Sequence, residues 1–292
     1  MNDYLVRGMS MDGFVKVVGI RSTELVRRGA QIQGTTPNAT AAFGRALTAA
    51  SMMGNMQKVE NGSMTLQIRG GGPIGTITVV SDWQGNVRGC VTEAKVPLVE
   101  KFPGKLDVGA TVGTDGTLTV IRDLQMKEPY IGSTQLVSGE IGDDITAYFA
   151  QSEQTPTACA LGVLVDRDLS AKVAGGYLVQ LLPGAPDEVI DKLEKGIQRA
   201  GAVTRMLEAG MTPEDILGQV LGSLGVVFME TTEVSYKCYC DRDRVTSALI
   251  SLGKKELAEI AQEKKTFPIS CQFCDTVYEF TPEDIEGLLT SL

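Results

Sequence analysis

The stretches "KCYCDRDRV" (237–245) and "ISCQFCDTVYEF" (269–280) hold four of the chain's six cysteines in two tight pairs. These residues are Cys238, Cys240, Cys271 and Cys274. Zinc prefers a tetrahedron of ligands, and each tight pair can supply two neighbouring corners of sulfur. The thirty residues between the pairs, 241–270, then close a loop that has helical periodicity of its own. The spacing therefore predicts one Zn²⁺ per chain, bound by four thiolates in the reduced protein.

The composition limits the class of protein. The chain has 292 residues, a net charge of −9 and an apolar content of 43%, which is ordinary for a soluble globular protein. Its first twenty residues include four charged side chains, so they form neither a secretory signal nor a membrane span. We therefore expect a cytoplasmic protein whose thiols stay reduced, and paired cysteines there indicate metal binding.

The sequence contains no histidine, which excludes histidine-dependent catalysis and mixed cysteine–histidine zinc sites. We find no catalytic constellation and expect no enzyme activity. The stretch "GGGPIG" (70–75) satisfies the dinucleotide-binding pattern, but the strand-like "TITVV" follows it where that pattern needs a helix, so we expect a turn. Glu140, Asp143 and Asp144 form an acidic group, which we expect to solvate a loop and cap a helix.

We expect an α+β fold that begins with an N-terminal body over residues 1–184. A buried helix is predicted from about 38 to 56, just after Pro37. Runs of β-branched residues separated by glycines predict strands. These runs lie within residues 1–20, 62–96, 116–124 and 158–183.

An amphipathic helical linker is predicted over residues 185–231. Its first apolar stripe consists of Val189, Ile190, Leu193 and Ile197. Thr212 is the expected N-cap of a second helix, with Pro213 in the first turn. The stripe of this second helix consists of Ile216, Leu217, Val220, Leu221 and Leu224. The remaining C-terminal domain, residues 232–292, is short enough to need a cross-link such as a metal.

The cysteine pattern leaves two other classes open. A structural zinc ribbon would suit an assembly or nucleic-acid protein, yet residues 238–292 carry six basic and ten acidic side chains, which repel phosphate. A thiol oxidoreductase would place "CQFC" at the start of a helix, whereas the strand-like "TVYEF" follows it. We expect the other two cysteines, Cys90 and Cys159, to be buried and inert in their apolar surroundings.

Taken in order, these features resemble the heat-shock protein 33 family, the redox-regulated holdase chaperones of bacteria. The resemblance is carried by "CYC" (238–240) and "CQFC" (271–274). It is also carried by "GGGPIG", by "LVSGEIGDDITAYFAQSEQTP" (136–156) and by "AGGYLVQLLPGA" (174–185). It extends from near residue 1 to the end of the chain, and the metal positions show no departure.

The resemblance implies a substrate-binding body, a helical linker and a C-terminal redox switch in which the four paired cysteines hold Zn²⁺ while reduced. Under oxidant it implies the disulfides Cys238–Cys240 and Cys271–Cys274, zinc release and melting of the C-terminal domain and linker. Dimerisation and ATP-independent binding of unfolding proteins would follow, as part of a stress response. The acidic charge argues against nucleic acid or anionic membranes as partners.

Thiolate chemistry supplies a physical reason for such a switch. Zinc-bound thiolates remain nucleophilic, and we expect nearby Lys237, Arg242 and Arg244 to favour the thiolate further. Peroxide converts one thiolate to a sulfenic acid, which a neighbouring thiol captures as a disulfide. With the implied pairing, each disulfide closes a very short loop and cannot replace the link from residue 238 to residue 271. Oxidation should therefore melt the C-terminal domain.

Melting of the C-terminal domain would then free the linker. The apolar linker residues must pack on something in the reduced state. They are Leu217, Val220, Leu221 and Leu224, with nearby Val226, Val227 and Phe228. We hypothesise that they cover an apolar surface of the body that holds clients once it is exposed. The alternative is that the linker only completes the core of the body.

Overall fold

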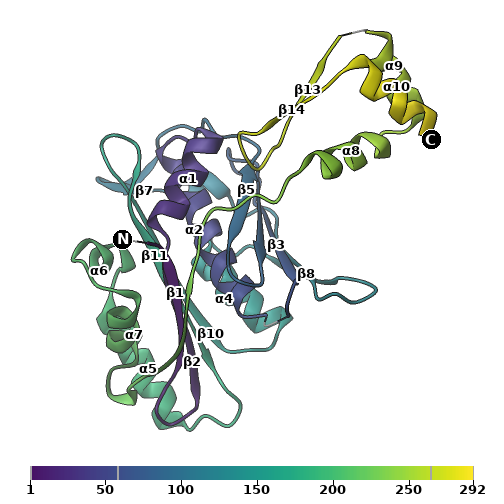
Figure 1. The fold of residues 1–292 in the computed structure, drawn as a ribbon. Coiled ribbons are helices and arrows are strands. Elements are labelled where there is room, and N and C mark those ends of the chain that lie inside the picture. The colour runs from purple at the N-terminus through teal and green to yellow at the C-terminus, as the bar shows by residue number, and fades with distance from the viewer. Residues whose placement is uncertain (1, 58, 264, 292) are drawn as a thin grey trace. The chain divides into compact units, whose positions relative to one another are not determined.

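The computed structural model describes residues 2–57, 59–263 and 265–291. Its contacts divide the chain into two compact units, which we call the main unit (residues 1–237) and the cysteine unit (residues 238–292). Figure 1 shows that both combine helices with strands, which confirms the predicted α+β class. The predicted linker belongs to the main unit by its contacts, so its separation from the N-terminal body stays a prediction.

The first sheet of the main unit is antiparallel, with the strand order β10-β11-β2-β1-β12. Its strands are β1 (Tyr4–Met9), β2 (Val15–Arg21), β10 (Thr157–Val165), β11 (Ala171–Leu181) and β12 (Val227–Glu233). Leu5 pairs with Ile20 of β2 on one side and with Thr232 of β12 on the other. Because side chains alternate along a strand, Leu5 faces one hydrophobic cluster and Val6 faces another. Both faces of this sheet are therefore buried.

The second sheet is also antiparallel and has the order β5-β4-β3-β8-β9. Its strands are β3 (Ser63–Arg69), β4 (Thr76–Asp82), β5 (Val87–Val91), β8 (Thr117–Asp123) and β9 (Tyr130–Gln135). A short hairpin follows β5 and consists of β6 (Glu100–Phe102) and β7 (Lys105–Leu106). The predicted strand regions are thus confirmed. Buried and partly exposed residues alternate along β3 and β4, so this sheet presents one apolar face to the core.

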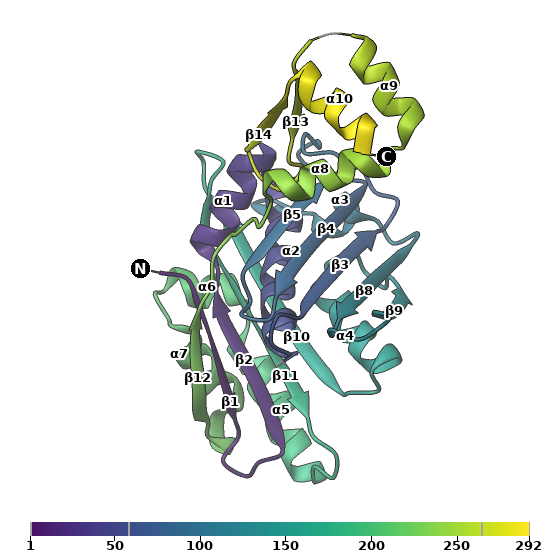
Figure 2. The same cartoon turned by 45° about the vertical axis from the view of Figure 1, so that its right-hand side comes forward.

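Helix α2 (Pro37–Asn55) lies between the two sheets and contacts strands of both (Figures 1 and 2). Pro37 occupies the start of the helix, as predicted, and nearly every following residue is buried. Small residues let the neighbouring elements approach closely. At Gly44, for example, an added Cβ would lie 2.7 Å from Val26 and 3.0 Å from Val163. The run of alanine and glycine therefore explains how a helix fits between two sheets.

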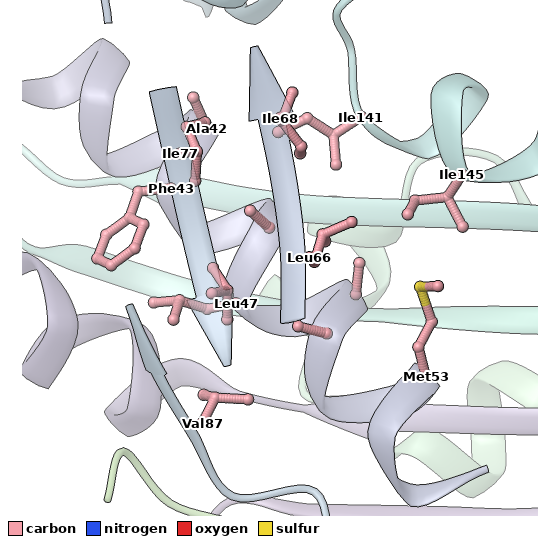
Figure 3. Close-up of a cluster of buried hydrophobic side chains, with 14 of the residues drawn as sticks. Ala42, Phe43, Leu47, Met53, Leu66, Ile68, Ile77, Val87, Ile141 and Ile145 are labelled. Carbon is pink, nitrogen blue, oxygen red and sulfur yellow. The ribbon is translucent and has the colours of Figure 1, made fainter. Parts of the chain in front are cut away.

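Side chains of α2 fill the central core of the main unit. Figure 3 shows Phe43 and Leu47 of α2 beside Leu66 and Ile77 of the second sheet, with Ile145 of α4 nearby. Three further helices contact this core. They are α1 (Thr23–Gln33), α3 (Val108–Val112) and α4 (Gly142–Ser152).

Most of the predicted helical linker forms helices on the other face of the first sheet, but residues 227–231 lie in strand β12, which corrects the prediction of helix there. The helices are α5 (Asp187–Ala200), α6 (Val203–Glu208), α7 (Pro213–Leu221) and the 3₁₀ turn η1 (Gly222–Leu224). Thr212 caps α7 as predicted, since its hydroxyl accepts a hydrogen bond from the Asp215 amide. Leu217 is fully buried and packs on the backbone of Gly19, where an added Cβ would lie 3.0 Å from its Cγ. The predicted stripe of α7 therefore faces the sheet.

The strand β12 departs from the expectation that all apolar linker residues are packed. Val227 and Phe228 are 52% and 42% exposed, and Met229 is 69% exposed. Backbone pairing with β1 holds β12 at the edge of the sheet, so its position does not depend on burial of these side chains.

Residues 234–237, which we call the strap, join β12 to the first paired cysteine. They run along the edge of the second sheet, where the Lys237 amide donates to the Val87 carbonyl at 2.8 Å. The Tyr236 hydroxyl donates to the carbonyl of Gly89 at 2.9 Å and accepts from its amide at 3.2 Å. The chain is therefore bonded to both sheets just before it enters the cysteine unit.

The cysteine unit is small. Its elements are α8 (Arg242–Ser251), α9 (Lys254–Gln262), β13 (Phe267–Ser270), β14 (Val277–Phe280) and α10 (Pro282–Ser291). The helices of the loop 241–270 and the strand after "CQFC" are thus confirmed. Its described buried apolar residues are Leu249, Leu257, Phe280 and Ile285. None of the described helices of the whole chain is long and apolar enough to cross a membrane.

Candidate metal centre

The four paired cysteines form a single cluster. The sulfur atoms of Cys238, Cys240, Cys271 and Cys274 all lie within 4.8 Å of one another. The Sγ atoms of Cys238 and Cys271 are 3.8 Å apart, and those of Cys240 and Cys274 are 3.4 Å apart. All four are free thiols. In a tetrahedral site with Zn–S bonds of ~2.3 Å, neighbouring sulfur atoms lie about 3.8 Å apart. The donor set and its spacing therefore suit a metal ion of that size.

Two short segments position the sulfur atoms. Cys238 and Cys240 lie in the extended segment before α8, whose N-cap Asp241 accepts a hydrogen bond from the Arg244 amide at 2.7 Å. The second pair lies in the turn between β13 and β14, where the amide of Cys271 donates to the carbonyl of Thr276 at 3.0 Å. A helix start and a hairpin turn thus bring together residues that are 33 positions apart. "CQFC" lies between strands, which is unlike the helix start of a thioredoxin-type site.

Hydrogen bonds distinguish the Cys274 thiol from those of Cys238 and Cys271. Burial raises the pKa of Cys238 to about 12 and also raises the pKa of Cys271. Burial acts the same way on Cys274, but hydrogen bonds from the side chain and backbone of Thr276 and from Cys240 outweigh it and lower its pKa to about 7. Binding of a divalent cation would favour loss of the remaining thiol protons, because only thiolates are good ligands.

Tyr278 of β14 is a contact that sequence analysis missed. Its hydroxyl donates to the Sγ of Cys240 at 3.1 Å, and this bond raises the pKa of the tyrosine. Donors of this kind orient a ligand sulfur and tune its charge from outside the ligand set. The only signal in the sequence is that Tyr278 follows Cys274 by four residues in a strand, which does not specify a contact.

The predicted role of the neighbouring arginines needs correction. The guanidinium group of Arg242 donates to Asp284 and to the carbonyl of Glu279, both at 2.8 Å, and lies 4.4 Å from the centre of the Phe280 ring. Arg244 pairs with Asp241 at 3.7 Å. These groups are therefore engaged by carboxylates and an aromatic ring, because α8 turns them toward β14 and α10 or along its own first turn.

The other two cysteines lie outside the cluster, in the main unit. Both residues are half-buried, and Cys159 packs against the core of the main unit, so the expectation of burial is confirmed only in part. The reason is that β5 and β10 each expose part of the face that carries them. Burial of the thiol raises the pKa of Cys159 to about 12, so this residue is a poor nucleophile as expected.

The acidic group of "SGEIGDD" has structural partners. Asp144 is fully buried, and its Oδ1 and Oδ2 accept hydrogen bonds from backbone amides that include those of Val137 and Ile141, at 2.7 and 2.9 Å. Glu140 pairs with Arg45 at 2.6 Å. "GGGPIG" is a turn before β4, as predicted, and its glycines pack against backbone: an added Cβ at Gly70 would lie 2.4 Å from the carbonyl oxygen of Val112.

These features define a class of protein that has a main unit of two sheets around a buried helix and a small second unit whose four thiols can bind a metal. The sequence model of the family described as "Hsp33 protein" matches residues 3–281. The chain therefore belongs to the Hsp33 family of chaperones.

Individual relatives agree with this assignment. The "33 kDa chaperonin" of Ruminiclostridium cellulolyticum is 46% identical over 289 residues, which cover 99% of this chain and 98% of the relative. The protein of the same name from Lachnoclostridium phytofermentans is 44% identical over 290 residues, 99% of each chain. The crystal structure of the 33 kDa chaperonin of Thermotoga maritima superimposes with a TM-score of 0.92 at 36% identity, covering 100% of this chain and 99% of the other.

Proposed function

We propose that this protein is a redox-regulated holdase that binds unfolding proteins without ATP and has no catalytic activity. In the reduced form Cys238, Cys240, Cys271 and Cys274 hold one Zn²⁺, and oxidation of these residues activates the protein. The observation that carries the proposal is the sulfur cluster, which joins two segments of a unit with a very small core. Membership of a chaperone family supports the same conclusion.

Zn²⁺, when bound, would cross-link the segment before α8 to the β13–β14 turn. The four buried apolar side chains among the described residues supply little hydrophobic stabilisation for a unit of this length, so its folding depends on that cross-link. Removal of the cross-link is therefore the step that matters for regulation.

The cysteines are the groups that hydrogen peroxide oxidises. A thiolate attacks hydrogen peroxide to give a sulfenic acid and hydroxide, and a second thiol then displaces water from the sulfenic sulfur to form a disulfide. Each disulfide uses one peroxide, which accepts two electrons. We propose the pairs Cys238–Cys240 and Cys271–Cys274, which leave nothing to span the 33 positions between the two segments. The cysteine unit then unfolds.

Unfolding of the cysteine unit removes the ordered chain that directly follows the strap. We propose that the strap, β12 and helices α5–α7 then loosen and uncover the outer face of the first sheet. Leu217 and Leu221 of α7 are fully buried there against residues that include Val6, Val17 and Tyr177. An apolar sheet face of this kind suits unfolded clients, since it binds exposed hydrophobic side chains without sequence specificity. Activated chains would also dimerise, in the cytoplasm and during stress.

The test is aggregation of a heat-unfolded client enzyme, followed by light scattering. Reduced zinc-loaded protein should leave aggregation unchanged, whereas peroxide treatment at raised temperature should suppress it and release zinc. The double variant Cys271→Ser/Cys274→Ser should suppress aggregation without peroxide. Cys90→Ser, a matched change outside the cluster, should behave like the unaltered protein.

Two results would contradict the proposal. Equal suppression by reduced and oxidised protein would favour the alternative, a structural zinc-ribbon assembly or nucleic-acid-associated protein. A linker that stays resistant to protease after zinc release would contradict the coupling between the cysteine unit and α5–α7.

A further inference from the structure

The side chain of Tyr278 is fixed in the position from which its hydroxyl donates to the Sγ of Cys240 at 3.1 Å. Tyr278 lies on β14 opposite Ile269 of β13, and both side chains pack against the small core of the cysteine unit. Because side chains alternate along a strand, Tyr278 shares one face of β14 with Phe280, which is fully buried. Burial of Phe280 therefore determines the direction in which the Tyr278 ring points.

Arg242 holds the segment that carries Cys240 against the same strand. Its guanidinium group donates to the carbonyl of Glu279 at 2.8 Å and lies 4.4 Å from the centre of the Phe280 ring. Arg242 follows Cys240 by two residues, and Glu279 and Phe280 directly follow Tyr278. The contact between Tyr278 and Cys240 is therefore one part of a wider attachment of this segment to β14.

Cys240 and Cys238 differ in the groups that donate to their sulfur atoms. Both residues are half-buried, so exposure does not distinguish them. With a metal bound both would be thiolates, because only thiolates are good ligands, so ionisation does not distinguish them either. Cys238 accepts a hydrogen bond from the backbone of Cys240, whereas Cys240 accepts one from the side chain of Tyr278. A substitution at residue 278 can therefore alter one sulfur and leave the donor of the other in place.

We propose that Tyr278 is a positioning residue that protects Cys240 from peroxide and so raises the amount of oxidant needed to activate the protein. This inference rests on the proposed function, in which the paired cysteines sense the oxidant. A hydrogen bond to a thiolate stabilises its negative charge and lowers the nucleophilicity of the sulfur.

The protected step is the attack of the Cys240 thiolate on hydrogen peroxide. The sulfur forms a bond to one oxygen, the O–O bond breaks, and the products are a sulfenic acid and hydroxide. The thiol of Cys238 then displaces water from the sulfenic sulfur to form the disulfide. Without the Tyr278 hydroxyl the Cys240 sulfur keeps more electron density, so the first of these two steps becomes faster.

The variant Tyr278→Phe tests this, because it keeps the aromatic ring and removes only the hydroxyl. Zinc-loaded protein is treated with less than one equivalent of peroxide in excess dimedone, which traps sulfenic acids. Trypsin cleaves after Lys237 and Arg242, so one peptide, 238–242, contains both cysteines and each serves as the reference for the other. Fragmentation in the mass spectrometer gives the ratio of label on Cys240 to label on Cys238. We expect this ratio to rise about threefold in the variant, since nucleophilicity follows about half of a change in thiolate basicity.

Cobalt substitution provides a second measurement that involves no oxidation. In the Co²⁺-loaded variant the sulfur-to-cobalt charge-transfer band should move to longer wavelength, because a sulfur that accepts one hydrogen bond fewer has lone pairs of higher energy. The ligand-field bands should stay in place, since the four sulfur ligands are unchanged. A tyrosine that only fills space would leave the charge-transfer band unmoved.

Tyr130→Phe, the same change on the exposed strand β9, is the control and should leave both measurements unaltered. The proposal is overturned if Tyr278→Phe leaves the ratio of label unchanged or if the charge-transfer band does not move. Failure of the proposed function is a separate result. It would appear as unchanged client aggregation after complete oxidation of the unaltered protein, and the ratio of label and the cobalt spectrum would still decide the role of Tyr278.

Discussion

Different interactions stabilise the two units of this molecule. The main unit has two large hydrophobic clusters, one between the sheets around α2 and one beneath α5–α7. The cysteine unit has four described buried apolar side chains and a cluster of four thiols. Hydrophobic burial alone can hold the first unit but not the second, because small units bury too little surface. We therefore expect the main unit to be stable by itself and the stability of the cysteine unit to depend on a bound metal.

The strongest test of this comparison is removal of the metal cross-link. In Cys271→Ser, or after chelation, we expect the cysteine unit to unfold, because structural zinc contributes about 10–16 kcal/mol in units of this kind. The main unit should keep its own unfolding transition. Hydrogen exchange resolved by residue would show complete loss of protection after residue 237. Cys90→Ser is the control, and a protected α9 in the metal-free protein would contradict the comparison.

A change beneath the linker should act on the main unit instead. Leu217→Ala leaves a cavity between α7 and β2, and such truncations cost about 2–5 kcal/mol. Chemical denaturation followed by circular dichroism should show this loss in the main transition, with zinc content unchanged. Leu98→Ala, at a position 66% exposed, should have almost no effect. A Leu217→Ala protein of unaltered stability would show that α7 is only loosely attached.

The pH dependence of the main unit offers a third test, through Asp3. Burial raises the pKa of this carboxyl from 3.8 to about 6, although hydrogen bonding to the Leu25 amide and the charge of Arg21 oppose the shift. The folded state therefore binds the proton more tightly than the unfolded state. The contribution of Asp3 to stability should be highest below pH ~4 and fall by up to about 3 kcal/mol as the pH rises to ~6.

Asp3→Asn should remove this part of the pH dependence, measured as the difference in unfolding free energy between variant and unaltered protein. Glu128→Gln, at an exposed position, is the matched control. A difference that does not change between pH 4 and pH 6 would mean that Asp3 keeps an ordinary pKa in the folded protein.

The smallest expected effect concerns the strap at the junction of the two units. Tyr236→Phe removes the hydroxyl that bonds both the carbonyl and the amide of Gly89, at a cost of about 1 kcal/mol per hydrogen bond. Exchange of the Gly89 amide should accelerate while the bulk of the main unit stays protected. Tyr130→Phe, on the exposed β9, is the control. Unchanged exchange at Gly89 would show that the strap is held by its backbone alone.

Features that depend on residues close together in the chain could be predicted from the sequence. Two tight cysteine pairs without histidine indicated a sulfur cluster, and the structure brings all four sulfur atoms together. Thr212 and Pro213 marked the start of α7, and the apolar stripe that follows faces the sheet. In each case the signal lies within a few residues and does not depend on the tertiary fold.

Contacts between distant segments could not be predicted in this way. β12 pairs with β1, from the opposite end of the main unit's sequence, and no turn specifies that register. Tyr278 reaches Cys240 only because the β13–β14 hairpin lies beside the segment before α8. Arg242 follows Cys240 by two residues, yet its guanidinium group binds Asp284. Proximity along the chain was misleading where helix geometry determines side-chain direction.

The strap also constrains a residue at the other end of the sequence. An added Cβ at Gly29 of α1 would lie 3.1 Å from the Tyr236 ring and 2.8 Å from Leu47. The absence of a side chain at position 29 therefore lets the Tyr236 ring pack closely against α1. Across relatives the two positions should covary, with a larger residue at 29 accompanied by a smaller one at 236. The residue at position 29 of α1, which is far from the paired cysteines in sequence, would then change together with the residue that precedes them in the strap.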